Sequence, residues 1–267
     1  MIPMIINDLA DAFDHVIGSS AGAINGAYFV DHYANTISAY INDLTTKDFV
    51  NLMRREKKVD VDYAIDKVMK GKHPFNMEHL ASSKTQLHIV VTDAKNGRKV
   101  VLSNHHLFEL IYEELRASAA LPLLYDRPVL VAGKYYIDGS VADAIPLDVA
   151  FKLGCTDILV VMNQQLGNYH FDKHHRRLER HLVRLFAKDQ PEAIKRILPT
   201  NEQLLQVNIR RLLKPHKKVR IYVLEPSDEE MMVSLGSIDK PKIEKLAKLG
   251  IADMSIMLNK EIVQKIR

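Results

Sequence analysis

The sequence lacks several features that would indicate a membrane-spanning or disulfide-bonded protein. Its one cysteine, Cys155, has no partner in the chain for a disulfide, which fits a reducing compartment. No run of about 18 apolar residues is present, so we expect no transmembrane helix. The N-terminus has no basic segment followed by an apolar one, so we expect no secretory signal. These absences predict a cytoplasmic or peripheral membrane protein.

What is present is ordinary for a globular protein. The chain has 267 residues, of which 47% are hydrophobic and 26% are charged. This length is sufficient for one large domain with a sizeable core. Predicted strands alternate with predicted helices, which indicates an α/β fold with a mainly parallel sheet and an added antiparallel hairpin.

The apolar patterns also place the individual elements. Asn96-Gly97 separates two apolar runs and suits a tight hairpin turn, and Ala132-Gly133 forms a second turn of this kind. Strands are expected at 15–19, on both sides of each hairpin turn, at 157–162 (buried) and at 219–226. Helices are expected at 5–13, 21–42, 60–70, 107–118, 146–153, and as a pair around Gly250 within 240–266.

One short motif is typical of a nucleophilic serine. The stretch VIGSSAGAINGA places Gly18, Ser20 and Gly22 in the order G-x-S-x-G, after a predicted strand and before a predicted helix. In a nucleophile elbow of this form, a sharp turn exposes the serine hydroxyl, and glycines avoid clashes of a Cβ. The amide of Ala21, at the start of the helix, would face a developing oxyanion. The alternative is a tight loop of small residues without a catalytic role.

A nucleophilic serine needs a base, and histidine is the usual one. No histidine stands in a recognisable triad context, and the candidates are His105, His106, His170, His174, His175 and His181. The order of elements also differs from that of the α/β-hydrolase fold. In that fold several strands precede the elbow, whereas here at most one predicted strand does. His170 and His174 have helical i, i+4 spacing, but no glutamate accompanies them as in a metalloprotease, so we expect no metal site.

Asp138 is the other candidate base. It follows the strand-like residues YYI and precedes Gly139, and a helix is predicted from Pro146 onward. A partly buried aspartate at a strand end has a raised pKa and could accept the serine proton directly. The alternative is that Asp138 has no catalytic role, since Asp-Gly is a favourable turn pair after a strand.

Three segments in this order, VIGSSAGAINGA, RASAALPLLY and YYIDGSVADAIPLDVAFKLGCTDILVV, resemble bacterial patatin-like phospholipases. The resemblance covers roughly residues 5–165. It implies a three-layer α/β/α sandwich, hydrolysis of fatty-acyl esters of lipids without a cofactor, and a dyad of Ser20 as nucleophile and Asp138 as base. The Asp-Gly-Gly of the family is Asp138-Gly139-Ser140 here. We expect a catalytic core at 1–168 and a helical extension with one strand at 169–267.

The sequence departs from the family at its beginning. The family has a glycine-rich loop about thirty residues before the elbow, after the first core strand, and that loop supplies oxyanion-hole amides. Here Met1 stands only nineteen residues before Ser20, so the expected core is N-terminally truncated. Three explanations remain open: a misplaced start codon, an impaired descendant that binds lipid or a partner, or another segment in place of the strand. A missing central strand would leave an apolar sheet edge unpaired unless another segment takes its place.

A basic segment stands out against the mild formal net charge of +4. Residues 170–220 hold 14 basic and 5 acidic residues, a local net charge of +9. The segment predicts either solvated basic helix faces or peripheral contact with anionic lipid. Nucleic-acid binding is not expected, because no interleaved aromatic platform accompanies the charge. The sequence does not indicate an oligomeric state.

Overall fold

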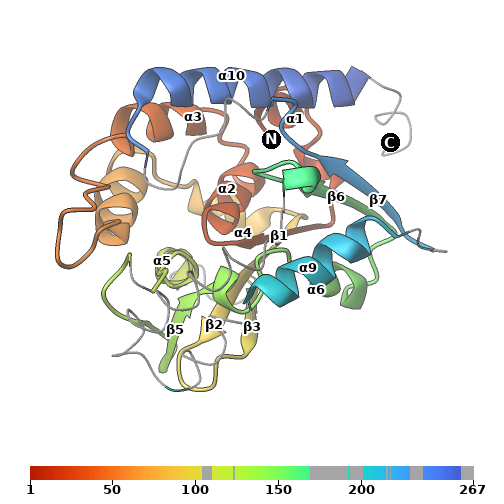
Figure 1. Cartoon of the computed structure of the whole chain (residues 1–267). Coiled ribbons are helices and arrows are strands. Elements are labelled where there is room, and N and C mark those ends of the chain that lie inside the picture. The colour runs from red at the N-terminus through yellow and green to blue at the C-terminus, as the bar shows by residue number, and fades with distance from the viewer. Residues whose placement is uncertain are drawn as a thin grey trace.

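A computed structural model describes residues 1–103, 110–122, 124–168, 192, 201–214, 216, 218–228 and 237–259 (Figure 1). Five strands form the main sheet: β1 (His15–Ser19), β2 (Gln86–Asp93), β3 (Lys99–Ser103), β4 (Val129–Val131) and β5 (Lys134–Asp138). β3 lies along one side of β2. β1 and β5 share the other side, because β1 pairs with residues 86–90 of β2 and β5 pairs with residues 91–93. β4 then pairs with β5.

The fold class is α/β as expected, but the sheet is mixed and not mainly parallel. Only β1 runs parallel to its neighbour β2, whereas β3, β5 and β4 are joined by antiparallel pairings. Both predicted hairpins form, and their turn residues Gly97, Ala132 and Gly133 have positive φ angles of 71°, 47° and 79°. Such turns impose antiparallel neighbours, whereas the parallel pairing of β1 with β2 in the described chain follows a long helical crossover.

Helical elements lie against both faces of this sheet. On one face, Leu87, Ile89 and Val91 of β2 pack in the largest core cluster. This cluster includes residues of α2 (Ala21–Val30), η3 (Tyr63–Lys72), α4 (Met77–Ser82) and α5 (Ile111–Ser118). On the other face, the hydroxyl of Thr92 accepts a hydrogen bond from the amide of Ala142, directly after the short helix η5 (Gly139–Val141). This arrangement agrees with the predicted layers.

Two predicted N-terminal helices are interrupted. The first is split into α1 (Ile2–Ile6) and η1 (Ala10–Ala12), and the second into α2, α3 (Thr36–Ser38) and η2 (Ala39–Asp43). Asp8 and His32 stand at the interruptions with positive φ angles of 55° and 54°. A continuous helix has no place for such angles. The predicted helix at 60–70 corresponds to η3, and α5 covers the described part of the predicted helix at 107–118.

The C-terminal region is built into the core. After α6 (Leu147–Lys152), strand β6 (Asp157–Val161) pairs in parallel with β7 (Arg220–Leu224), which crosses the predicted boundary at residue 168. β6 is only half-buried, contrary to the predicted buried strand. Among the described residues, η6 (Leu166–Asn168) and α9 (Asn201–Leu212) lie between β6 and β7 in sequence.

The last described element is α10 (Lys240–Met257), which runs through Gly250 as one helix where a pair was predicted. Gly250 lies in open space, so nothing in its packing forces a break. Met254 of α10 is fully buried beside Met4, Leu9 and Phe29. In Figure 1 this helix lies across the top of the molecule, close to the N-terminal α1. The C-terminal segment therefore closes part of the core.

The expected unpaired edge is present in the described part of the chain. There β1 pairs with β2 on one side only, and β6 pairs with β7 only. A groove of about 540 Å³ lies between the start of β1 and the β6–β7 pair. Its lining includes His15 of β1, Leu159 of β6 and Tyr222 of β7.

Candidate active site

The register of the main sheet brings Ser20 and Asp138 together. Ser19, the last residue of β1, is the partner of Val90, and Asp138, the last residue of β5, is the partner of the next residue, Val91. Two strands that approach from opposite directions therefore end at the same point of β2. The Ser20 hydroxyl donates a hydrogen bond to Asp138 Oδ2 at 2.7 Å, although 118 residues separate the two in sequence.

Ser20 has the backbone of a sharp strand-to-helix turn. Its φ and ψ angles are 55° and −129°, a region that residues other than glycine rarely occupy. Gly18 makes the turn possible, because a Cβ there would lie 2.5 Å from backbone atoms of Ala23. The strand, the turn and the helix α2 thus have the arrangement expected of a nucleophile elbow.

The other two elbow residues differ in their roles. Ala21 is the first residue of α2, so its N–H has no carbonyl one turn earlier in the helix to bond. It is exposed beside Ser20 and can donate to an oxyanion. For Gly22 the steric reason given by the sequence argument is wrong, because a Cβ there would meet nothing within 4 Å.

Asp138 is a buried carboxylate without a cation beside it among the described residues. Only 1% of the residue is exposed. Burial raises its pKa to about 6, against the lowering effect of hydrogen bonds from Ser140 and Ser20. The Ser140 amide donates to Oδ1 at 2.8 Å, which leaves Oδ2 for the Ser20 hydroxyl. The carboxylate is thus oriented, and its pKa suits proton transfer near neutral pH.

Gly139 is required by close packing. A Cβ on this residue would lie 2.0 Å from the Val90 carbonyl oxygen and 2.8 Å from the Ser19 hydroxyl. Only glycine therefore lets the Asp138 loop approach the end of β1. The third residue of this turn is Ser140, whose backbone amide donates to Asp138 and whose side chain also lowers the pKa of the aspartate by hydrogen bonding.

Two positioning residues were missed by the sequence argument. The Ser118 hydroxyl accepts a hydrogen bond from the Ser20 amide at 2.9 Å and donates one to the Val90 carbonyl at 2.7 Å. The Thr92 hydroxyl donates to the Asp138 carbonyl at 2.8 Å. Ser118 is the serine of RASAALPLLY. Its polar side chain among alanines was the sequence signal that could have indicated its role. Thr92 has no comparable signal, since threonine is common in strands.

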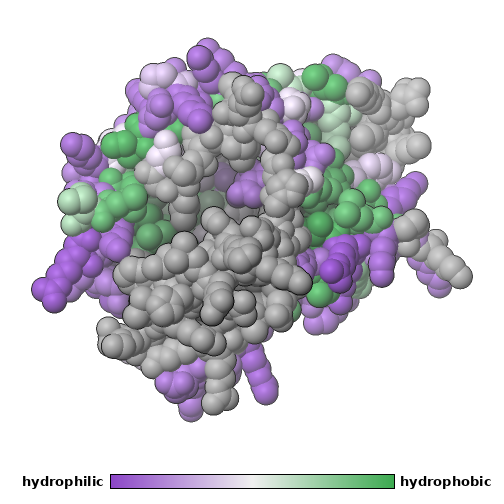
Figure 2. Space-filling view, in the orientation of Figure 1, coloured by the Kyte–Doolittle hydropathy of each residue, from purple (hydrophilic) through white to green (hydrophobic). Residues whose placement is uncertain are grey.

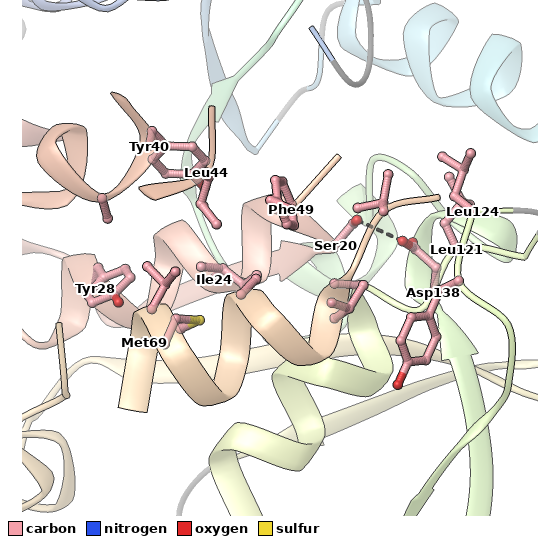
Figure 3. A pocket seen from close by; sticks show the side chains of 18 residues that line it. Ser20, Ile24, Tyr28, Tyr40, Leu44, Phe49, Met69, Leu121, Leu124 and Asp138 are labelled. Atoms are coloured by element: carbon pink, nitrogen blue, oxygen red, sulfur yellow. Dashed lines mark hydrogen bonds between the residues drawn. The ribbon is translucent and has the colours of Figure 1, made fainter. Parts of the chain in front are cut away.

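An apolar cavity of about 150 Å³ adjoins the dyad. Ser20 and Asp138 lie at one end of the side chains drawn in Figure 3, and Tyr28 and Met69 lie at the other. Ile24 of α2 lies between them. The remaining lining is also mostly apolar: Ala21, Ala39, Tyr40, Leu44, Phe49, Val59, Val61, Ala64, Val68, Ala119, Leu121, Leu124 and Tyr125.

An ion-pair cluster supports the wall of this cavity. Arg116 of α5, of which 7% is exposed, bonds to Asp62, to Asp66 at 2.8 Å and to Glu113 at 2.9 Å. Asp62 also accepts a hydrogen bond from the cavity-lining Tyr125 at 2.7 Å. The cluster therefore ties the start of η3 to α5 and to the cavity wall.

Other sequence candidates lie outside the described residues or away from the dyad. His105, His106, His170, His174, His175 and His181 fall in segments that the structure does not describe. Most of the basic segment 170–220 does so too. No histidine is in the described lining of the cavity. Within the described ranges, no cluster of three or more histidine, cysteine or acidic residues could hold a metal ion, and no helix has the length and hydropathy to cross a membrane.

Comparison with known proteins relates the chain to a protein family and to a curated relative. The family model described as patatin-like phospholipase matches residues 6–151. The uncharacterized protein YjjU of Escherichia coli (strain K12) is 24% identical over 246 residues. That alignment covers 89% of this chain and 66% of YjjU, so the chain spans slightly less than two thirds of this relative.

Proposed function

The chain belongs to the patatin-like phospholipase family, and we propose that it cleaves fatty-acyl esters of phospholipids or related lipids through a Ser20–Asp138 dyad. The family supports lipid acyl hydrolysis in general. The observation that supports this dyad is the 2.7 Å hydrogen bond from the Ser20 hydroxyl to a buried carboxylate beside an apolar cavity.

The geometry gives each group a role. Ser20 Oγ attacks the ester carbonyl carbon while its proton moves to Asp138 Oδ2. The oxyanion that forms faces the Ala21 amide and the positive end of the α2 dipole. The protonated Asp138 then donates to the leaving alcohol, and an acyl-enzyme remains. Water, deprotonated by Asp138, releases the fatty acid and restores the serine.

The cavity supports an acyl chain as the bound part of the substrate. Ser20, Ile24 and Tyr28 repeat every four residues along α2 and line the same cavity. Eight residues of helix span about 12 Å, which matches an extended acyl chain of roughly eight to ten carbons. The apolar lining contacts the chain, and the dyad at one end places the carbonyl carbon beside Ser20 (Figure 3).

A second candidate function is lipid binding without hydrolysis. Within the described residues, the elbow offers the Ala21 amide as an oxyanion donor. Loss of one oxyanion donor lowers kcat by about 10²–10³. A chain with the same acyl cavity but slow chemistry would retain the lipid instead of cleaving it.

Covalent labelling separates the two functions. We expect a fluorophosphonate probe to label the wild-type chain and not Ser20→Ala, with hydrolysis of p-nitrophenyl octanoate lost in the same variant. Ser19→Ala, which changes the neighbouring serine, is the matched control and should keep its labelling. An unlabelled wild type would support the binding function, and labelling that persists in Ser20→Ala would refute the dyad.

A further inference from the structure

Residues 47–58, here named the tip loop, carry apolar side chains into solvent. The loop connects η2 to η3. Leu52 is 57% exposed and Met53 is 94% exposed, the highest value among the large apolar residues of the described chain. Figure 1 shows this orange loop projecting at the left, and Figure 2 shows hydrophobic beside hydrophilic atoms at the same edge.

The tip loop is held in this position by its own hydrogen bonds. At its base, the Asn51 amide donates to the Lys58 carbonyl at 2.8 Å, and Val50 forms a bridge with Val59. At its tip, the Met53 amide donates to the Asn51 side chain at 3.1 Å. The Arg54 guanidinium donates to the carbonyls of residues 47 and 48. The apolar tip is therefore presented by a fixed backbone.

Basic residues follow the apolar tip directly. Residues 54–58 read RREKK, four basic residues against one acidic residue. Arg55 is exposed. Lys57 is bound to Asp62 at 2.6 Å, which attaches the loop to the ion-pair cluster of the cavity wall. An apolar tip followed by an exposed cation, Arg55, in a segment of net positive charge matches the layered chemistry of an anionic bilayer, with acyl chains beneath phosphate headgroups.

The tip loop also joins the catalytic cavity. Phe49 and Val59, at the two sides of its base, both line the cavity that contains Ser20 and Asp138. A bilayer touched by the tip would thus lie next to the wall of the acyl site.

We propose that the tip loop docks on anionic membranes, with Leu52 and Met53 among the acyl chains and the exposed Arg55 at the headgroups. Docking would bring lipid esters to the proposed acyl site. The assignment rests on the proposed function for its purpose but not for its test, since membrane binding is measurable without turnover.

The chain contains no tryptophan, so one introduced indole reports the tip alone. In a Ser20→Ala background, Met53→Trp should shift its emission to the blue with phosphatidylglycerol-containing vesicles. The shift should be absent with pure phosphatidylcholine and should fall at high salt. Ile6→Trp is the matched control, because Ile6 is 69% exposed but is followed by Asn7 and Asp8. Its emission should not change.

Substitutions then measure the two parts of the tip loop by vesicle sedimentation in the Ser20→Ala background. Arg55→Gln should weaken binding about fivefold, and Met53→Ser about tenfold or more. Ile6→Ser should bind as the parent does. Failure of the parent to bind anionic vesicles would overturn the proposal. So would binding that both tip substitutions leave unchanged, which would assign membrane contact to the basic segment 170–220. Fluorophosphonate labelling of the wild type tests the dyad separately.

Discussion

Two carboxylates, Asp138 in the lining of the cavity and Asp62 bonded to the lining residue Tyr125, have pKa values shifted in opposite directions. Asp138, buried without a cation among the described residues, has its pKa raised to about 6 by burial. Asp62 is also subject to burial, but hydrogen bonds from Lys57 and Tyr125 and the charge of Arg116 lower its pKa to about 2. An aspartate side chain can therefore take up a proton near neutral pH at position 138, whereas at position 62 it stays ionised.

The difference matches the proposed roles of the two residues, Asp138 as the catalytic base and Asp62 as a structural anchor. The Asp138 charge is costly in the folded state, because the unfolded chain ionises at lower pH. The Asp62 charge stabilises the wall, because its cations are already in place. A catalytic base needs the first environment and a structural anchor the second.

The strongest test removes the charge at the catalytic carboxylate. Asp138→Asn should lower kcat/KM for p-nitrophenyl octanoate by about 10²–10⁴-fold, because the base is lost. It should also raise the free energy of unfolding at pH 8 by about 1–3 kcal/mol, because a buried charge with a raised pKa is removed. Ester hydrolysis and urea unfolding measure the two effects. Loss of both activity and stability would contradict the comparison.

The matching test removes the cation at the anchor. Arg116→Met should lower the free energy of unfolding by about 2 kcal/mol, less than for a fully buried pair because Asp66 and Glu113 are more than a third exposed. Arg127→Met is the control: Arg127 also pairs with Asp62 but is 57% exposed, so its removal should cost about 0.5 kcal/mol. Equal effects of the two substitutions in urea unfolding would refute the role of burial.

The pH dependence of activity sharpens the comparison. Only ionised Asp138 accepts the serine proton, so kcat/KM should fall as pH drops through about 6 and be about tenfold lower at pH 5. Asp62 stays ionised over this range, because its pKa is about 2. A pH–rate profile with a short ester as substrate measures this decrease in kcat/KM at acidic pH. A profile that stays flat down to pH 4 would exclude Asp138 as the base.

The smallest expected effect concerns the cavity that adjoins Ser20 and Asp138. Ile24→Phe should narrow it and lower kcat/KM for the octanoate ester several-fold, while the acetate ester is cleaved as before. Ile256→Phe, at an exposed position on α10, is the control for the added ring. A chain-length series of p-nitrophenyl esters measures the change. An equal loss for both esters would place Ile24 outside the acyl path.

The sequence predicted local features well and long-range pairings less well. The Gly18–Ser20 turn and the Asn96-Gly97 hairpin depend on short spacings, and both are present in the structure. The pairing of Val91 with Asp138 depends on which strand occupies the second half of β2, which no local pattern encodes. The sheet was for this reason expected to be mainly parallel.

The polar supports of the site were equally hidden in the sequence. Ser118 reaches Ser20 across 98 residues, and Arg116 reaches Asp62 across 54. These contacts form only after α5 has packed on the sheet. Asp138 was accessible to prediction because it ends a strand next to a required glycine, whereas the cations around Asp62 lie on separate elements.

The register that joins β1 and β5 on one side of β2 also affects folding kinetics. The hydrogen bond between Ser20 and Asp138 closes a loop of 118 residues, so it forms only when both strands have docked on β2. Contacts this distant in sequence form late and slowly. Reactivity of Ser20 toward a fluorophosphonate would therefore appear at the end of refolding. The time course of covalent labelling during refolding would then report when the sheet is complete.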